Sequence, residues 1–569
     1  MRSTFLKRRA GTLALCGMLG VMAAMSAHAS SHQASLRFNP ASGGTVGQVT
    51  VYGQTVTYTA YTVSYVAKPN DPAKQVMSIY IPANATQGSP IFMPLNTGGY
   101  MELDLLTPAD VTIDNVNSSG SGSGSAIAAA LALSKGIVVV SPAGRGRNTT
   151  MLVNGVTTEV GNGPAALVDL KAAVRYLKYN DSVMLGNANK IVVSGTSGGG
   201  AMTSLLGITG DSAVFKPYLD EIGAAPSSDS VYAASPFCPI TDLDNANAAY
   251  EYFFYGSGIT TANPGRTAPI TLSNNDQRLS AVMAQMYPTY LNRLGLKHPD
   301  TGVPLKLNSY SPDAVAGGSY RNYVYSLFSA SATRFIIDSG YVSADGSLNE
   351  AGQTYMATAE TVNGVKSGLT PDSVITWNAN TRTATLKSWK NLLVYMNRMK
   401  PVGAFDNGFY NVTGEMDLFN TDPAALKNDI TVAEGWNHFD PNLKDAIAKA
   451  GLSEVEGYTS IKNFRVRSDV ARWAAMMNPM YYVLRYNGHG GIDVNPYAAT
   501  VYGTSSVAKH WRIRVGSYDR DSSPFVSANL AIALQNRGLN VDYKIAWNQP
   551  HSGNYDNTDM IDWIAGLSN

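Results

Sequence analysis

Short apolar runs alternate with longer amphipathic segments in the first and the last parts of the chain. The β-branched and aromatic runs predict strands at 47–53, 55–67, 75–82, 90–95, 136–140, 190–194, 510–515 and 541–547. Helical periodicity predicts helices at 126–134, 164–179, 201–208 and 524–537. Strands that alternate with helices form a parallel sheet with crossover helices on its faces. The pattern therefore predicts an α/β fold with a mostly parallel central sheet.

This alternation is lost in the middle of the chain. Between about 239 and 506, helical segments such as 276–294 and 469–478 lie among connections rich in Gly, Pro and Asn. We therefore predict one discontinuous α/β domain, formed by residues 30–240 and 507–569, with a large lid-like insertion at 241–506. The Gly/Ser tract at 118–125 is predicted to be a flexible surface loop.

The N-terminus has the three parts of a secretory signal peptide. Four basic residues among the first nine precede an apolar run from Leu13 to Met25, and Ala27-His28-Ala29 provides the small residues of a cleavage site. The apolar run is shorter than the roughly 20 residues that span a bilayer, which argues against a membrane anchor. Residues 1–29 are therefore predicted to be removed on export, and the product is expected to be periplasmic or extracellular without stable membrane insertion.

Composition narrows the class of protein further. The chain has 569 residues, of which 44% are hydrophobic and 15% charged, so it is globular. A formal net charge of +1 gives no basic surface for nucleic acid. Removal of the leader takes Cys16 and leaves Cys238 as a single thiol, which excludes an internal disulfide. Neither an HExxH motif nor paired cysteines are present, so no cofactor is expected; the oligomeric state and a structural ion in the insertion stay undetermined.

The sequence Gly195-Thr196-Ser197-Gly198-Gly199 matches the G-x-S-x-G pattern of a nucleophilic serine. It lies between the strand at 190–194 and the helix at 201–208, where a sharp turn exposes the serine hydroxyl. The helix N-terminus also stabilises developing negative charge. The alternative is an ordinary glycine-rich turn.

A serine nucleophile needs a base and an acid, which in this fold follow it in the order acid, then histidine. His551 is the one histidine after the strand at 510–515, and it lies on the loop after the last predicted strand. The loop after 510–515 supplies two candidate acids, Asp519 and Asp521. Either aspartate could instead be a charge at a helix N-terminus or part of a surface ion pair.

An oxyanion hole would combine the backbone N–H of Gly198 with donors from the segment 96–100. Its Gly98-Gly99 pair follows an early strand, like the HGGG-type motif of esterases. The alternative for this glycine pair is a plain turn.

With these residues in view, the sequence resembles the bacterial tannases (tannin acyl hydrolases) of the α/β-hydrolase fold. The similarity covers most of the chain after the leader and is sharpest at 90–101, 194–201, 237–243, 476–480 and 508–564. The resemblance implies a catalytic triad of Ser197, Asp519 and His551. The length of 435–503 and the leader suggest a larger, exported branch of the family.

The resemblance also implies residues that bind the galloyl ring. Asp521 matches the family's ring-binding aspartate, Lys400 lies in the segment similar to the one carrying its lysine, and Ile240 occupies the position of an aliphatic residue that packs on the ring. Glu415 corresponds to the family glutamate, although the residue before it is Gly rather than Pro and the local spacing differs by one residue. Otherwise Lys400 and Glu415 would be surface charges and Ile240 a core residue.

These residues together predict an exported serine esterase that hydrolyses the galloyl esters of tannins and simple gallates through an acyl-enzyme, releasing gallic acid. The alternative within enzymes is a feruloyl- or chlorogenate-type phenolic acid esterase with the same triad. Fungal tannases and feruloyl esterases carry a cysteine beside both the serine and the histidine, where this chain has Thr196 and Ser552. A serine peptidase of similar fold and a polyphenol-binding protein without activity are the remaining readings.

Overall fold

The computed structural model describes most of the chain. The described residues are 36–108, 111–113, 124–153, 155–256, 271–308, 317–359, 361–362, 365–366, 369–407, 413–419, 438–459, 466–484, 495–553 and 555–567. The predicted signal peptide at 1–29 lies outside them. Within these ranges, no helix combines the length and the apolar character needed to cross a membrane.

The centre of the fold is a ten-stranded sheet with the order β16-β15-β10-β9-β4-β6-β3-β2-β1-β5. Its strands are β1 (Thr45–Val51), β2 (Gln54–Ser64), β3 (Val76–Pro82), β4 (Ile91–Leu95), β5 (Thr112–Ile113), β6 (Val138–Pro142), β9 (Ile191–Thr196), β10 (Ala233–Phe237), β15 (His510–Tyr518) and β16 (Asn540–Pro550). The six strands from β16 to β6 are parallel to one another, and the strands from β6 to β1 pair antiparallel. The predicted α/β fold with a mostly parallel sheet is therefore confirmed.

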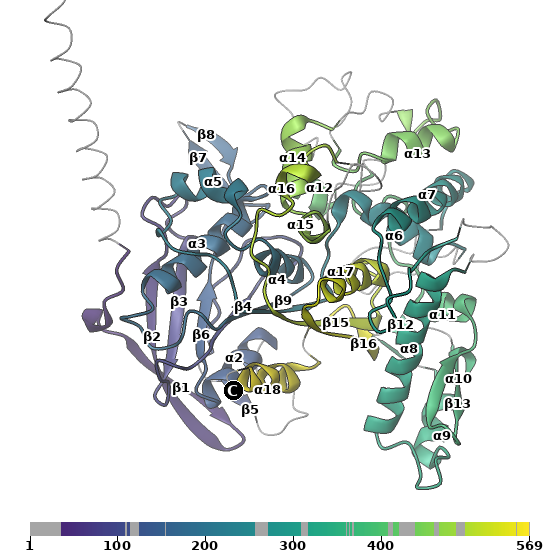
Figure 1. The fold of residues 1–569 in the computed structure, drawn as a ribbon, viewed down its shortest axis with the longest axis horizontal. Helices are drawn as coiled ribbons and strands as arrows, with labels where there is room; N and C mark the ends of the chain where they lie inside the picture. Colours follow the sequence, from purple (N-terminus) through teal and green to yellow (C-terminus); the bar gives the residue numbers. More distant parts are fainter. Residues whose placement is uncertain are drawn as a thin grey trace, which may run out of the picture.

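Helices cover both faces of this sheet (Figure 1). Those of the sheet domain are α2 (Gly124–Ser134), α3 (Ala165–Tyr179), α4 (Gly198–Ile208), α5 (Lys216–Glu221), α17 (Pro524–Asn536) and α18 (Asn557–Gly566), with the short 3₁₀ helices η1 (Pro40–Ser42) and η2 (Ala213–Phe215). Every residue of β4 is buried, and successive side chains enter different cores: Ile91 and Met93 pack with α3 and α4, whereas Phe92 packs with α2 and α18. Burial on both faces explains why the central strands read as continuous apolar runs.

The chain between β10 and β15 forms a second group of helices. They are α6 (Leu243–Phe254), α7 (Asn274–Arg293), α8 (Ser319–Asp338), α9 (Glu350–Ala357), α10 (Pro371–Val374), α11 (Trp389–Met396), α12 (Gly414–Leu418), α13 (Leu443–Lys449), α14 (Ser468–Met476), α15 (Pro479–Val483) and α16 (Ala498–Val501). Two short hairpins join them, β11 (Thr361–Val362) with β12 (Val365–Lys366) and β13 (Ile375–Asn378) with β14 (Thr383–Leu386). Among the described residues of this part, none pairs as a strand of the large sheet. The limits 241–506 stay a prediction.

These helices lie toward β15 and β16, on the side away from β1 and β2 (Figure 1). An aromatic cluster around Phe525 of α17 joins the two parts, because its ring contacts Tyr252, Phe253, Tyr287, Tyr320 and Trp389. The Tyr320 hydroxyl also donates to Asn529 Oδ1 at 2.6 Å. The middle of the chain therefore shares one core with the C-terminal part of the sheet.

Several elements differ from the sequence-based predictions. Strand β10 was not predicted, since its sequence Ala-Ala-Ser-Pro-Phe has no β-branched residue and contains a proline. Helix α2 begins at Gly124, so the last two residues of the Gly/Ser tract are helical, while 118–123 lie outside the described residues. A further hairpin, β7 (Thr150–Val153) with β8 (Val156–Glu159), was also not predicted.

A buried pair of carboxylates lies where the chain leaves β10 for α6. Asp242 accepts hydrogen bonds from Tyr290 at 2.6 Å and from Asn478 at 2.8 Å, and Asp244 accepts from the same Asn478 amide at 2.7 Å and from Tyr481 at 2.5 Å. Burial and the nearby charge of Asp244 raise the pKa of Asp242 to about 7, in spite of these hydrogen bonds. Near neutral pH the pair therefore holds a proton that the unfolded chain has lost.

This pair predicts a pH-dependent stability that Asp242→Asn removes. Because the pKa of Asp242 is raised on folding, its stabilising contribution is complete below about pH 4 and is lost as the pH rises through about 7. An amide supplies an N–H in place of the shared proton. The difference in unfolding free energy between pH 4 and pH 8 should shrink by about 1–4 kcal/mol in Asp242→Asn, measured by calorimetry across that range. Asp220→Asn, at an exposed ion pair with Lys216, serves as control; a variant curve parallel to the wild-type curve would contradict this assignment.

Candidate active site

Ser197 lies at the sharp turn between β9 and α4. Its backbone angles are φ 61° and ψ −120°, a conformation that is strained for a residue with a side chain. The turn is made possible by its neighbours: a Cβ atom on Gly195 would lie 2.7 Å from the carbonyl oxygen of Gly199, and one on Gly200 would overlap the carbonyl oxygen of Phe237. The predicted strand–turn–helix context of the G-x-S-x-G sequence is therefore present.

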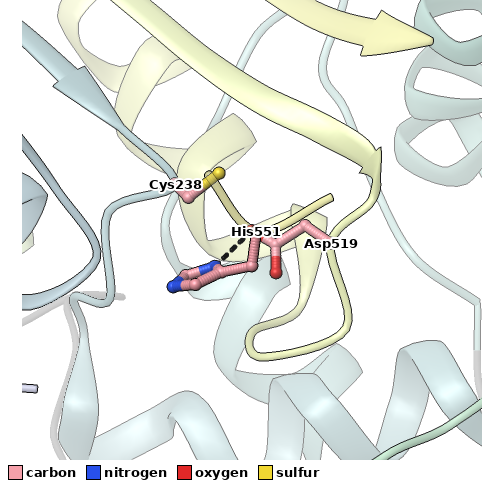
Figure 2. Close-up of side chains that lie close together, drawn as sticks. All are labelled: Cys238, Asp519 and His551. Carbon is pink, nitrogen blue, oxygen red and sulfur yellow. Dashed lines mark hydrogen bonds and ion pairs between the residues drawn. The ribbon is translucent and has the colours of Figure 1, made fainter. Parts of the chain in front are cut away.

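Asp519 and His551 meet at the ends of β15 and β16. His551 Nδ1 lies 3.0 Å from Asp519 Oδ2, and Asp519 Oδ1 accepts the backbone N–H of Asp521 at 3.0 Å. Figure 2 shows one ring nitrogen of His551 facing Asp519 while the other points away from the pair. Asp519 is fully buried, so the carboxylate and the imidazole interact with little solvent screening. Of the two candidate acids, Asp519 is the one that contacts the imidazole.

The segment that follows β10 connects Ser197 to this pair. Ser197 N–H donates to Phe237 O at 3.0 Å, and Ile240 N–H donates to Ser197 O at 3.4 Å. Cys238, which lies between Phe237 and Ile240 in the sequence, packs against the Asp519–His551 pair. One potential metal-binding atom from each of Cys238, Asp519 and His551 lies within 4.8 Å of the other two (Figure 2). The loop that carries His551 also packs against the residue before Ser197, because a Cβ atom on Gly553 would overlap the hydroxyl of Thr196.

The nucleophile and the base thus come from segments that contact one another. Within the residues that the structure describes, the Ser197 hydroxyl and the His551 imidazole do not share a hydrogen bond. Such a bond often tightens only when substrate is bound.

The environment of His551 favours its charged form. Burial by itself disfavours the imidazolium, but the charge of Asp519 and its hydrogen bond outweigh this effect, and the charge of Asp521 adds to it. The pKa of His551 is therefore well above its ordinary value. Asp519 therefore stabilises the imidazolium that forms when His551 holds a second ring proton.

The predicted oxyanion segment packs directly against the turn. A Cβ atom on Gly198 would lie 2.5 Å from the backbone nitrogen of Tyr100 and 3.1 Å from that of Gly99, so these amides face Gly198. Gly99 and Tyr100 both have positive φ, of 58° and 59°, whereas no atom lies within 4 Å of a Cβ position on Gly98. The structure therefore places Gly99 and Gly198 together and adds the N–H of Tyr100, which the sequence did not single out, whereas no such contact is seen for Gly98.

Ile240 and Asp521 lie beside the candidate triad. Ile240 is 4% exposed; its N–H bonds to Ser197 and its carbonyl accepts the hydroxyl of Tyr100. Asp521 is joined to Asp519 through its N–H and is 7% exposed. Ile240 is therefore hydrogen-bonded directly to the candidate serine, and Asp521 directly to the candidate acid.

Tyr250, a residue that the sequence analysis missed, links the backbone of Lys400 to that of Arg520. The buried hydroxyl of Tyr250 donates to Arg520 O at 3.0 Å and accepts the N–H of Lys400 at 3.0 Å. Lys400 Nζ itself lies 4.1 Å from the centre of the Phe405 ring. No motif could have revealed Tyr250, which is one of 32 tyrosines in the chain.

Glu415 lies on α12, near the oxyanion segment. Burial raises the pKa of Tyr100 well above its ordinary value, and the charge of Glu415 contributes to this shift. Glu415 is therefore close enough to Tyr100 for its charge to act on the Tyr100 hydroxyl. The candidates thus come from seven separate segments of the chain.

Cys238, Asp519 and His551 also form the one group of three potential metal ligands found in the described part of the chain. Two of its members already bind each other through the proton on the imidazole, and a metal ion would have to replace that proton. Burial and the charge of Asp519 raise the pKa of the Cys238 thiol, which disfavours the thiolate that a metal prefers. The absence of a required cofactor stays a prediction.

Comparisons with known proteins agree with this fold. A family model described as BD-FAE matches residues 151–288. A tannin acyl hydrolase solved in complex with ethyl gallate is 32% identical, with a TM-score of 0.70 over 94% of this chain and 99% of that one. The tannases of Lactobacillus plantarum (30% identity, TM-score 0.69, 94% and 100% covered) and Fusobacterium nucleatum (31%, 0.71, 94% and 99%) are similarly close. A search of the curated proteins found no match.

The fold and these relatives define a carboxylic ester hydrolase of the α/β-hydrolase type. Identity of 30% or more over nearly the whole length of several tannases identifies the group within this class. The chain belongs to the family of bacterial tannases (tannin acyl hydrolases).

The contact between His551 and Asp519 predicts how Asp519→Asn changes the pH dependence of ester hydrolysis. Loss of the carboxylate charge should lower the pKa of His551, so the acid limb of the kcat/KM profile should move to lower pH. The maximal rate should fall by about 10²–10⁴-fold, because the imidazole loses its orienting partner. Profiles measured with a small ester from pH 4 to 10 check both effects; an unchanged acid limb would show that Asp519 does not act on the base.

Proposed function

We propose that this protein is an exported serine esterase that hydrolyses galloyl esters, of tannins and of simple gallates. The observation that carries the proposal is that the Ser197 turn contacts the Gly99–Tyr100 amides and, through the segment after β10, the His551–Asp519 pair. Support for the substrate comes from the relatives, of which one was solved with ethyl gallate and another with 3,4-dihydroxybenzoate.

The mechanism begins with proton transfer from the Ser197 hydroxyl to His551, while the serine oxygen attacks the ester carbonyl. Asp519 stabilises the imidazolium that results. The oxyanion accepts hydrogen bonds from the N–H of Gly198 and from the amides of the 98–100 segment. His551 then protonates the leaving alcohol, and in the second half-reaction it activates the water that releases gallic acid from Ser197.

Selectivity arises at the ring end of the acyl group. Asp521, Glu415 and Lys400 would exchange hydrogen bonds with the ring hydroxyls, and Ile240 would pack on the ring face. A ring without a hydroxyl, or with a methylated one, leaves buried polar groups unpaired. Such a site rejects the wrong ring by as much as roughly 10⁴–10⁵-fold. A feruloyl esterase with the same triad would instead accept a methoxylated ring.

A panel of methyl esters that differ only in ring hydroxyls tests this substrate assignment. We expect methyl gallate to have the highest kcat/KM, with successive losses for the dihydroxy ring, the unsubstituted ring and the ferulate ester. Asp521→Ala should lower kcat/KM for methyl gallate by about 10²-fold or more and leave hydrolysis of a small acetate ester nearly unchanged. The matched control is Asp542→Ala, which removes an aspartate paired with Arg514. Equal turnover of methyl ferulate and methyl gallate would favour the feruloyl esterase instead.

Export is proposed from the leader alone. The full-length chain produced in a Gram-negative host should be cleaved after Ala29, and N-terminal sequencing of the periplasmic or secreted protein measures this directly. A chain that keeps residues 1–29 and stays in the cytoplasm would contradict the proposal.

A further inference from the structure

Arg147 contacts both ends of the candidate site. Its backbone N–H donates to Tyr100 O at 2.9 Å, and its side-chain Nε donates to Gly99 O at 2.7 Å. A second arm of the guanidinium pairs with Asp417 Oδ2 at 2.5 Å. The side chain is 23% exposed and that of Asp417 20%, so this ion pair is largely shielded from water.

Asp417 lies on α12, two residues after Glu415. This short helix is tied to the sheet domain through its C-terminal end: the amide of Asn162 donates to Asp417 O at 3.0 Å, and Gly163 N–H donates to Leu418 O at 2.8 Å. At its N-terminal end, a Cβ atom on Gly414 would lie 3.2 Å from the guanidinium carbon of Arg147. The position of α12, and with it that of Glu415, therefore depends on Arg147 and its neighbours.

The Gly99–Tyr100 segment is fixed by the same residue, through its side chain at Gly99 O and its backbone N–H at Tyr100 O. These two residues have the left-handed backbone that turns their amides toward Gly198, and Arg147 holds the carbonyl of each. An arginine presents donors in a rigid planar fork, so one side chain can bind Gly99 O and Asp417 at a set separation. A lysine in this position has a single nitrogen and cannot bind both in the same geometry.

We propose that Arg147 is a positioning residue that sets the distance between the oxyanion donors and the helix carrying Glu415. The inference deepens the proposed function and rests on it, since only an acyl group with a hydroxylated ring occupies both ends at once. Arg147 acts through Gly99, Tyr100 and α12, and its own contacts are to those protein groups.

The experiment compares Arg147→Lys, Arg147→Gln, Asp417→Asn and the double variant Arg147→Gln/Asp417→Asn on methyl gallate and p-nitrophenyl acetate. Asp417→Asn loosens only the ring end, so kcat/KM for methyl gallate should fall about tenfold, mainly through KM, while acetate hydrolysis stays within twofold. Arg147→Gln also releases Gly99 O, so kcat should fall by about 10–10²-fold for both esters. Arg147→Lys should keep the ion pair with Asp417 but not the bond to Gly99 O. Its KM for methyl gallate should therefore recover more fully than its rate on p-nitrophenyl acetate.

Coupling of the two ends gives a second readout. The double variant should be no worse on methyl gallate than Arg147→Gln alone, because both changes break the same link. Arg175→Gln is the matched control, since it also removes a half-buried ion pair, with Asp229 at 2.8 Å, outside the site. All rates are measured well below the melting temperature of each variant.

Three outcomes would overturn the proposal. The first is a wild-type kcat and KM in Arg147→Gln, and the second is a double variant whose loss equals the product of the two single losses. The third is a loss of activity in Arg175→Gln as large as that in Arg147→Gln. Failure of the proposed function is distinguishable, because wild-type protein inactive on methyl gallate would still report on the oxyanion end through p-nitrophenyl acetate.

Discussion

The whole site depends on two backbone hydrogen bonds that join Ser197 to the segment after β10. Ser197 donates to Phe237 O and accepts from Ile240 N–H, which holds the serine in a strained conformation that costs of order 1–3 kcal/mol. These bonds also place everything on the 237–240 segment relative to the serine hydroxyl. Cys238 then reaches the Asp519–His551 pair, and Ile240 reaches Tyr100. A strained turn persists only when the surrounding structure determines it, and here the parallel pairing of β9 with β10 does so.

The insertion positions Lys400, one of the proposed ring-binding residues, through an equally specific set of contacts. Helix α6 starts at the buried Asp242–Asp244 pair and carries Tyr250, whose hydroxyl binds the backbone of Arg520 and of Lys400. The next residue, Glu251, forms a buried ion pair with Arg398 at 2.5 Å, and Arg398 Nε donates to Lys400 O. Removing one partner of such a pair costs about 3–5 kcal/mol, since it leaves an unpaired buried charge. The position of Lys400 is therefore determined by backbone hydrogen bonds to buried residues of the insertion rather than by contacts of its own side chain.

Much of the fold was predictable from the sequence, because the central strands are apolar on both faces and alternate with amphipathic helices. Strand β10 was missed, since Ala and Pro carry no strand preference and its identity comes from pairing with β9 and β15. In the site, G-x-S-x-G and the order of acid and base along the chain pointed to Ser197, Asp519 and His551. The residues alone left Asp519 and Asp521 open, and the resemblance to tannases favoured Asp519. The contact of 3.0 Å between His551 Nδ1 and Asp519 Oδ2 agrees with that choice. Tyr250 and Arg147 carry no motif, and their importance follows from backbone groups that they bind.

Those two residues explain how segments separated by long connections form one accurately spaced site. Closing a long loop costs conformational entropy, so a segment such as α12 or 399–406 stays in place only if it is fastened at its destination. Tyr250 fastens Lys400 to Arg520, and Arg147 fastens α12 to Gly99; in each case one side chain binds main-chain atoms of the sheet domain. Burial raises the pKa of Tyr250, which keeps its hydroxyl a neutral donor, and an arginine keeps its charge at any physiological pH. The link through Tyr250 therefore does not depend on pH in the physiological range, whereas the imidazole of His551 is the group whose protonation changes in the proposed reaction.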